Sequence, residues 1–256
     1  MERDQVSLNT LYGRVVAQLD LGDFQRRSLY DVTWAIGGAE LIRKQNVWYL
    51  CITQSKKLPE PDEPLGVIGC DFGIVNLCTT SDGDTFSGEH IDRVRDRYHL
   101  RRQRLQAVGT KSAKRRLKRN SGREQRFQKN TNHGISKRLV QKAAGKRKAL
   151  ALEDLTHIRQ RATVQRSQRR RHSSWAFHQL RMFVQYKAVL AGVRVIVVDP
   201  RNTSRTCSAC GYCDKQNRHS QSSFVCGSCG FAASADWNAA VNIERAAVNQ
   251  PMAARA

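Results

Sequence analysis

The pattern of apolar and polar positions divides the chain into a β-rich beginning and an alternating α/β remainder. Residues 39–44 and 47–53 are two apolar-rich runs separated by a polar pair, which predicts a β-hairpin. The stretch 58–64 follows and holds three of the five prolines, so it is the best linker in the chain. We therefore expect a β segment over residues 1–58 and a domain boundary behind it.

Beyond the linker, short continuous apolar runs alternate with stretches of helical periodicity. Four runs predict strands: 65–70, 74–80, 148–155 and 193–198. Continuous apolar runs of this length are typical of strands that are buried on both faces of a sheet. Apolar residues at helical spacing predict helices over 173–190 and 235–248. The order of these elements predicts an α/β fold in which helices cover a sheet.

Residues 91–150 interrupt this pattern, because they carry 21 Lys and Arg against three acidic residues. Sparse apolar residues such as Leu139 and Ala143 recur at helical spacing, which predicts two long helices with a break near residues 120–122. A solvated helix face usually mixes both signs of charge, whereas one sign throughout favours a surface that faces phosphates. The segment 156–172, with six Arg and no acidic residue, is predicted to be a loop.

The composition of the whole chain agrees with a folded protein that binds a polyanion. The 256 residues have a formal net charge of +22, and such an excess favours nucleic acid over an anionic membrane as the partner. A hydrophobic content of 40% suffices for one or two packed cores, which excludes a disordered basic tail. No apolar run approaches the roughly 20 residues of a membrane-spanning helix, and the first residues resemble no signal peptide. We expect a cytoplasmic protein.

Two CxxC pairs near the carboxyl end predict a zinc site. Cys207 with Cys210 and Cys226 with Cys229 are separated by 15 residues, which is a spacing typical of a four-thiolate centre. Two residues between thiolates allow a tight turn to place both sulfurs on one tetrahedral ion. Four protein ligands leave no open position for a substrate, so the predicted zinc is structural. Cys213 is expected to take no part.

Three acidic residues stand where α/β proteins usually place their chemistry. Asp71 and Glu153 each follow a predicted buried strand, and Asp236 begins the last predicted helix. Each alone is compatible with a turn cap or a helix-dipole partner. Together, on a strongly basic chain, they are the hard oxygen ligands that a pair of Mg²⁺ ions needs at a phosphodiester. Asp154 and Asp199 are expected to take no part.

Three motifs carry a family resemblance. Residues 69–77 (GCDFGIVNL), 152–155 (LEDL) and 236–243 (DWNAAVNI) resemble the three RuvC motifs of the TnpB family. These proteins are transposon-encoded RNA-guided endonucleases, formerly called OrfB-type transposases, and are related to type V CRISPR effectors. Further similarity lies at 126–137 on the second basic helix. The resemblance extends from about residue 8 to residue 248, with the motifs and the CxxC pairs in the family's order.

The resemblance implies an α/β fold with an RNase H-like (RuvC) core, an inserted zinc ribbon and a partial amino-terminal β-barrel (wedge) segment. The implied boundaries are 1–58 for the wedge segment, 64–204 for the nuclease core with its basic helical insertion 91–150, 205–231 for the zinc ribbon, and 232–256 for the final helix and tail.

The resemblance also assigns roles to residues. Asp71, Glu153 and Asp236 become the catalytic carboxylates that bind Mg²⁺, and the cysteines of the two CxxC pairs become the zinc ligands. Activated water would attack a DNA phosphodiester and leave a 5′ phosphate and a 3′ hydroxyl, with guide RNA and DNA as partners. The nucleic-acid-binding residues are predicted to be Arg115, Arg116, Lys118, Arg119, Arg126, Asn132, His133 and Lys137.

Family members usually extend further at the amino end, where a recognition domain and the first wedge strands bind guide RNA and target duplex. We therefore expect residues 1–58 to supply only the last strands of that barrel, and cleavage by this short form to be impaired. An alternative is a nucleic-acid-binding remnant that acts in transposition or its regulation without cutting. A third hypothesis, a basic zinc-ribbon protein of the translation or transcription machinery, leaves the three acidic residues unexplained.

Overall fold

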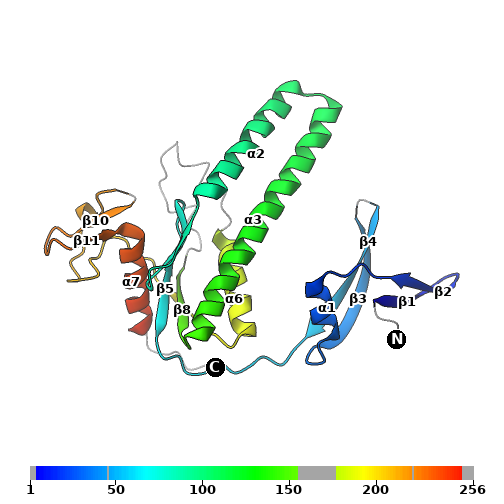
Figure 1. Ribbon diagram of the computed structural model, residues 1–256, viewed down its shortest axis with the longest axis horizontal. Helices are drawn as coiled ribbons and strands as arrows, with labels where there is room; N and C mark the ends of the chain where they lie inside the picture. Colours follow the sequence, from blue (N-terminus) through cyan, green and yellow to red (C-terminus); the bar gives the residue numbers. More distant parts are fainter. Residues whose placement is uncertain (1–3, 45, 155–176, 221, 250–256) are drawn as a thin grey trace. The chain divides into compact units, whose positions relative to one another are not determined.

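The chain forms two compact units, Met1–Leu58 and Pro59–Ala256 (Figure 1). The computed structural model describes residues 4–44, 46–154, 177–220 and 222–249. The Arg-rich segment 156–172, which the sequence predicts to be a loop, lies outside the described residues, as does the tail after residue 249.

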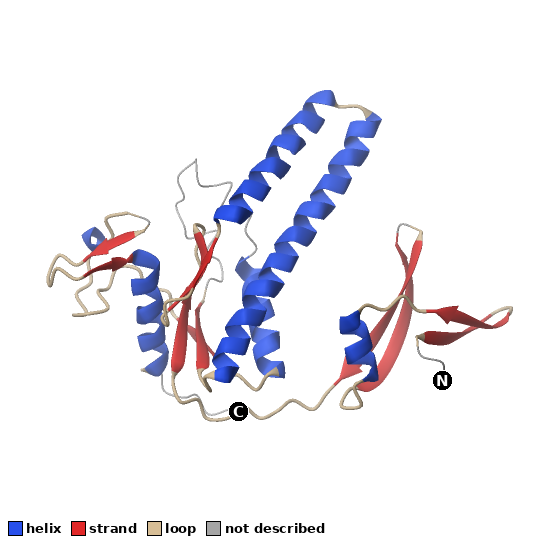
Figure 2. Ribbon diagram, viewed as in Figure 1, coloured by secondary structure: helices blue, strands red, loops and turns tan. Residues whose placement is uncertain are grey.

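The first unit consists of two β-hairpins and a short helix (Figure 2). Its elements are β1 (Gln5–Thr10), β2 (Gly13–Gln18), α1 (Asp23–Tyr30), β3 (Ala35–Lys44) and β4 (Val47–Ser55). The β3–β4 hairpin confirms the sequence prediction. The helix α1 corrects the expectation of a segment made of strands alone, because a helix of eight residues is too short to show a hydrophobic period. In the described part of this unit the strands form two separate two-stranded sheets, and none of its residues is buried.

The second unit is built on a five-stranded mixed sheet. Its strands are β5 (Val67–Asp71), β6 (Asn76–Thr80), β7 (Thr85–Ser87), β8 (Ala149–Glu153) and β9 (Val195–Val198). They lie in the order β7-β6-β5-β8-β9, with β5, β8 and β9 parallel and the other pairs antiparallel. All four predicted strands are present with somewhat different bounds, and the short edge strand β7 was not predicted.

The two faces of this sheet differ in the size of their side chains. The helices of the unit are α2 (Glu89–Val108), α3 (Lys111–Gly145), α6 (Phe177–Leu190) and α7 (Ala235–Val248). Ile68 and Leu150 belong to the core that includes α3 and α6, whereas Val67 and Ala149 belong to a second core with α7. Figure 1 shows α3 and α6 on one side of the sheet and α7 on the other. The central strands are therefore buried on both faces, as their apolar runs predict.

The small-residue face allows α7 to approach β5 at backbone contact distance. A Cβ atom on Gly69 would lie 2.0 Å from the carbonyl oxygen of Ala240 and 2.6 Å from the amide nitrogen of Glu244. Ala239 and Ala240 are themselves buried, and the bounds of α7 match the predicted helix. A glycine is required at this position because any side chain would collide with the backbone of α7 rather than with a side chain that can move.

The basic segment forms a helical hairpin whose break differs from the prediction. The predicted break near 120–122 is wrong, because α3 continues through these residues. The helices are instead separated at Gly109, which has a φ of 65° and ends α2, and Thr110, whose hydroxyl accepts a hydrogen bond from the amide of Ala113. Asn120 stays helical because its side chain is buried and donates to the carbonyl oxygen of Tyr98 on α2. None of the described helices is both long and apolar enough to cross a membrane.

We expect the substitution Gly69→Ala to lower the free energy of unfolding by about 3 kcal/mol, because α7 must move away from β5 to admit the methyl group. Urea unfolding followed by circular dichroism measures this change. Gly66→Ala is the matched control, since a Cβ atom there would meet only the Lys148 side chain, at 3.7 Å. Equal stability of the two variants would contradict the assigned close approach.

Candidate functional site

The strand register brings the first two predicted acidic residues to the same edge of the sheet. Cys70 pairs with Leu152 in the parallel β5–β8 ladder, so Asp71 and Glu153, one residue further on, end neighbouring strands. Asp236 lies in the first turn of α7, where it is buried and where its carboxylate accepts a hydrogen bond of 2.9 Å from the side-chain amide of Asn76.

The electrostatics of the three acidic residues show that they share one environment. Burial raises the pKa of Asp71 well above its usual value, and the nearby charges of Glu153 and Asp236 raise it further. Burial also raises the pKa of Glu153, although the hydroxyl of Thr203, which donates to its carboxylate, acts in the opposite direction. The structure thus brings together the carboxylates that the sequence singled out. A cation bound among them would offset both the cost of burying their charges and their mutual repulsion.

A basic residue that sequence reasoning missed lies beside these acidic residues. Arg218 follows the short 3-10 helix η1 (Lys215–Asn217), between the two CxxC pairs. Its guanidinium is 3.8 Å from the carboxylate of Asp236, and its charge counteracts the rise in the pKa of Asp71 and of Glu153. No motif or periodicity marks Arg218, and its position between the CxxC pairs is the one signal in the sequence.

The two acidic residues expected to take no part have other contacts. Asp154 forms an ion pair of 2.6 Å with Arg181 on α6. Asp199 accepts a hydrogen bond from the backbone amide of Arg201, although its charge also raises the pKa of Glu153.

The four cysteines of the CxxC pairs form a cluster that fits a zinc ion. The sulfurs of Cys207 and Cys229 are 3.8 Å apart, and those of Cys210 and Cys226 are 3.6 Å apart. Zinc–sulfur bonds of about 2.3 Å in a tetrahedron require sulfur separations of about 3.8 Å. Among the described residues, these cysteines alone form a group whose ligand atoms all lie within 4.8 Å of one another; the three carboxylates are more widely spaced. The geometry therefore suggests structural zinc.

Backbone geometry around the cysteines supports the same interpretation. Gly211 and Gly230, which follow the second cysteine of each pair, have φ values of 79° and 72°. These left-handed conformations turn the chain under the cluster at no steric cost. The backbone amide of Cys229 is the largest cause that lowers the pKa of Cys226, to about 7. The backbone amide of Tyr212 also lowers the pKa of Cys210, but hydrogen bonds with the neighbouring thiols raise it, to about 12. The hairpin of β10 (Ser223–Val225) and β11 (Ala232–Ser234) connects the second pair to α7.

Two asparagines of α7 fix the segment that enters the cysteine cluster. The side-chain amide of Asn242 donates to the carbonyl oxygens of Thr203 and Thr206, and that of Asn238 also donates to Thr206. The carbonyl oxygen of the Asn238 side chain accepts the backbone amide of Ser208. Because Asp236 lies on the same helix, the cysteine cluster and the acidic residues are held by one element.

The predicted nucleic-acid-binding residues divide into exposed and packed positions. The exposed ones are Arg115, Arg116, Lys118, Arg119, Arg126 and Lys137. Asn132 is fully buried and donates to Gln179 on α6, so its side chain joins these two helices. The half-buried ring of His133 stacks on Phe183 at 4.0 Å, which likewise joins α3 to α6.

We expect the substitution Asp71→Asn to stabilise the metal-free protein increasingly as the pH rises. An acid whose pKa is raised on folding binds more protons in the folded state, so stability falls once the pH exceeds the ordinary value of 3.8. The amide removes this penalty at about pH 8 and changes little at about pH 4. Thermal unfolding at both pH values in chelator measures the effect. Asp62→Asn, at an exposed position of the same unit, is the control, and a pH-independent difference would contradict the expected penalty.

Two family models match the chain. Residues 49–158 match the family described as Probable transposase (OrfB_IS605), and residues 177–243 match the one described as Cas12f1-like, TNB domain. The first match covers Asp71, Glu153 and the helical hairpin, and the second covers all four cysteines of the CxxC pairs and Asp236.

Curated relatives and solved structures give consistent similarities. TnpB-like protein MJ0751 of Methanocaldococcus jannaschii is 27% identical over 259 residues, which is 94% of this chain and 90% of the relative. The CRISPR-associated endodeoxyribonuclease Cas12f1 of Sulfoacidibacillus thermotolerans is 40% identical over 118 residues, 46% of this chain but 26% of that relative. The fold resembles that in the cryo-EM structure of a Cas12f1–sgRNA–target DNA complex, with a TM-score of 0.58 and 20% identity over 80% of this chain and 55% of that chain. The two family models, and a relative matched over nearly the whole chain, show that the chain is similar to TnpB-like proteins.

Proposed function

We propose that this chain is a transposon-associated, RNA-guided DNA endonuclease that hydrolyses phosphodiester bonds with the help of two metal ions. One observation carries the proposal: on a strongly basic chain, the half-buried Asp71 and Glu153 come together with the buried Asp236. Buried acidic residues that repel one another are costly to a fold unless a cation binds them. The names of the relatives, which include an endodeoxyribonuclease, support the same class of reaction.

The chemistry of these residues fits Mg²⁺, which prefers carboxylate oxygens and water. Two such ions, when bound, would supply stabilisation of the attacking and the leaving oxygen atoms. The chain's own residues would set the geometry. Thr203 would hold the Glu153 carboxylate and Asn76 that of Asp236, through the hydrogen bonds that they donate. Arg218 would offer its guanidinium to a phosphate oxygen at the edge of the site.

We further propose that the sheet unit is a RuvC-like core and that the CxxC pairs hold a zinc ribbon inserted before its last helix. In this proposal the domain boundaries are 1–58 for a wedge-type segment, 64–204 for the core with the insertion 91–150, 205–231 for the zinc ribbon, and 232–256 for the final helix and tail. The zinc ribbon would serve catalysis indirectly, because it carries Arg218 to the acidic residues.

Guide RNA and DNA are the proposed partners. Support comes from the net charge of +22 and from the related Cas12f1 structure, which is that of a complex with sgRNA and target DNA. A protein that binds these partners without cutting is the alternative, which a cleavage assay distinguishes.

We expect Asp71→Asn to abolish Mg²⁺-dependent DNA cleavage and to leave the affinity for nucleic acid within about twofold, because the substitution removes a metal ligand but no phosphate contact. RNA that co-purifies with the chain is sequenced, and DNA complementary to it, with randomised flanks, is the substrate. Asp62→Asn, at an exposed position of the same unit, is the control and should cut like the parent. Cleavage that survives in Asp71→Asn would refute the site, and a parent that binds but never cuts would support the alternative.

We expect Cys226→Ser to lose the zinc ion and to lower the melting temperature, because the metal supplies folding free energy to a small hairpin. Atomic emission of the purified protein should give about one zinc per chain in the parent and far less in the variant. Cys213→Ser is the matched control, since Cys213 is exposed and outside the cluster. A full zinc content in Cys226→Ser would contradict the assignment of the ligands.

A further inference from the structure

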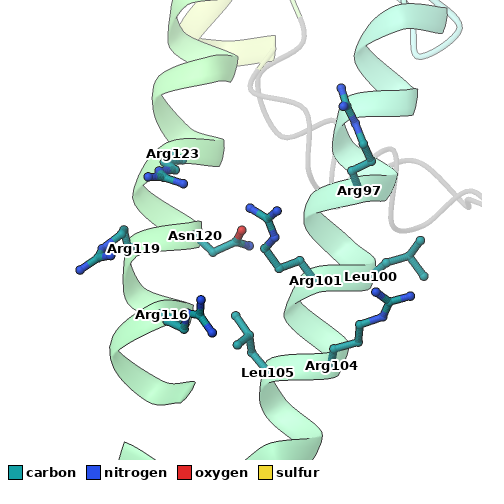
Figure 3. A pocket seen from close by; sticks show the side chains of 9 residues that line it. All are labelled: Arg97, Leu100, Arg101, Arg104, Leu105, Arg116, Arg119, Asn120 and Arg123. Carbon is teal, nitrogen blue, oxygen red and sulfur yellow. The ribbon is translucent and has the colours of Figure 1, made fainter. Parts of the chain in front are cut away.

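A groove lined with arginines separates the two helices of the basic hairpin (Figure 3). It has a volume of about 670 Å³ and is lined by Arg97, Leu100, Arg101, Arg104, Leu105, Arg116, Arg119, Asn120 and Arg123. Three arginines come from each helix, and no acidic residue lines the groove. Figure 3 shows Arg101, Leu105 and Arg116 pointing into the space between the helices.

The arginines of this groove are not neutralised by the described part of the chain. None of the six forms an ion pair with a described residue. The one ion pair that joins the described residues of α2 to those of α3 uses Arg102 and Glu124, which lie outside the groove lining. Like charges on facing helices repel one another, and this repulsion costs stability unless an anion lies between them. The groove is therefore suited to a ligand with several negative charges.

The spacing of the arginines matches a run of phosphates. Arg97, Arg101 and Arg104 lie on one face of α2, and a rise of about 1.5 Å per residue separates the first from the last by about 10 Å. In a strand whose bases stay stacked, successive phosphates are about 3.4 Å apart along the helical axis, so the groove spans about three stacked nucleotides and fewer of an extended strand.

The apolar part of the groove distinguishes an unpaired strand from a duplex. Leu100 and Leu105 line it, and an adjoining cavity of about 200 Å³ shares Arg97, Arg101 and Arg123 and adds Val94 and Tyr98. A duplex presents mainly phosphates and sugars to its surroundings. An unpaired strand also presents the faces of its bases, which stack on aromatic rings and pack on apolar side chains.

We infer that the groove between α2 and α3 binds an unpaired nucleic-acid strand, with its phosphates on the six arginines and a base against Tyr98. The inference rests on the proposed function, in which the chain binds RNA and DNA, and adds the part of the chain that takes a single strand. Of the residues predicted from sequence, Arg116 and Arg119 line this groove. Arg115, Lys118 and Arg126 do not.

The double variant Arg101→Gln/Arg116→Gln tests the groove against a control of equal charge, Lys111→Gln/Lys114→Gln, whose residues are exposed on α3 outside the groove lining. Fluorescence anisotropy of the full chain, freed of bound RNA, is measured with single-stranded RNA and DNA of about 12 nucleotides and with a duplex of the same length. We expect the groove variant to lose about tenfold in single-strand affinity, and the dependence of log K on log salt to become shallower by about 1.4. The control should lose about twofold or less.

Three further variants separate the effects of stacking from those of charge. Arg101→Lys/Arg116→Lys keeps the charges and should retain most of the affinity. Tyr98→Leu should weaken single-strand binding several-fold, whereas Tyr98→Phe should not, because it keeps the ring. Helix content by circular dichroism is compared for all variants, and affinity losses are read among those that match the parent.

These measurements distinguish a failure of the groove as a binding site from a failure of the proposed function. A parent that binds no nucleic acid would overturn that function itself. A parent that binds, with equal losses in the groove and control variants, would overturn the groove as a site and leave the function standing. Equal losses for the duplex and the single strand would overturn the assignment to an unpaired strand. A preference between the RNA and the DNA strand would identify which of them occupies the groove.

Discussion

The backbone contact between α7 and β5 is the constraint on which the rest of the second unit depends. Gly69 leaves no room for even a methyl group beneath Ala240, and small residues on β8 extend the same shallow face. Close approach of a helix to a sheet places the first turn of that helix within reach of the strand ends. Asp236 therefore lies near Asp71 and Glu153 because of the size of side chains several residues away.

The same helix connects the acidic residues to the cysteine cluster. Asn238 and Asn242, one turn apart on α7, hold the segment that leads into Cys207. After Cys207 the chain folds back toward the acidic residues at Arg218. The charge of Arg218 partly offsets the rise in pKa that burial causes in Asp71 and Glu153. A metal that orders the cysteine segment would thus affect the electrostatics of a site that it does not touch. The two proposed metal centres would be physically coupled through one helix.

Charge is distributed unevenly over the chain, with acidic and basic side chains gathered on different elements. The sheet with α7 gathers acidic residues that are buried or half-buried, whereas residues 91–150 hold 21 basic side chains against three acidic ones. Over residues 96–131, Ala113 and Asn120 are the buried side chains, so much of the surface of the α2–α3 hairpin is exposed. Placing the like charges on long helices that extend from the sheet keeps their repulsion away from the core.

The sequence alone determined four of the five strands of the sheet and the closing helix, and it singled out the cysteine quartet and the three acidic residues, because hydrophobic runs and ligand spacing are local signals. It did not locate the break in the basic hairpin, since the helix-breaking tendency of residues 120–122 is overcome by the contact of Asn120 with α2. It did not predict that Asn132 and His133 pack against α6, which covers the first fully and the second in part. The position of Arg218 beside the acidic residues and the arrangement of arginines on both sides of the groove depend on contacts between residues far apart in the chain. Tertiary structure alone decided these features, because burial and the proximity of charges arise only when separate elements pack together.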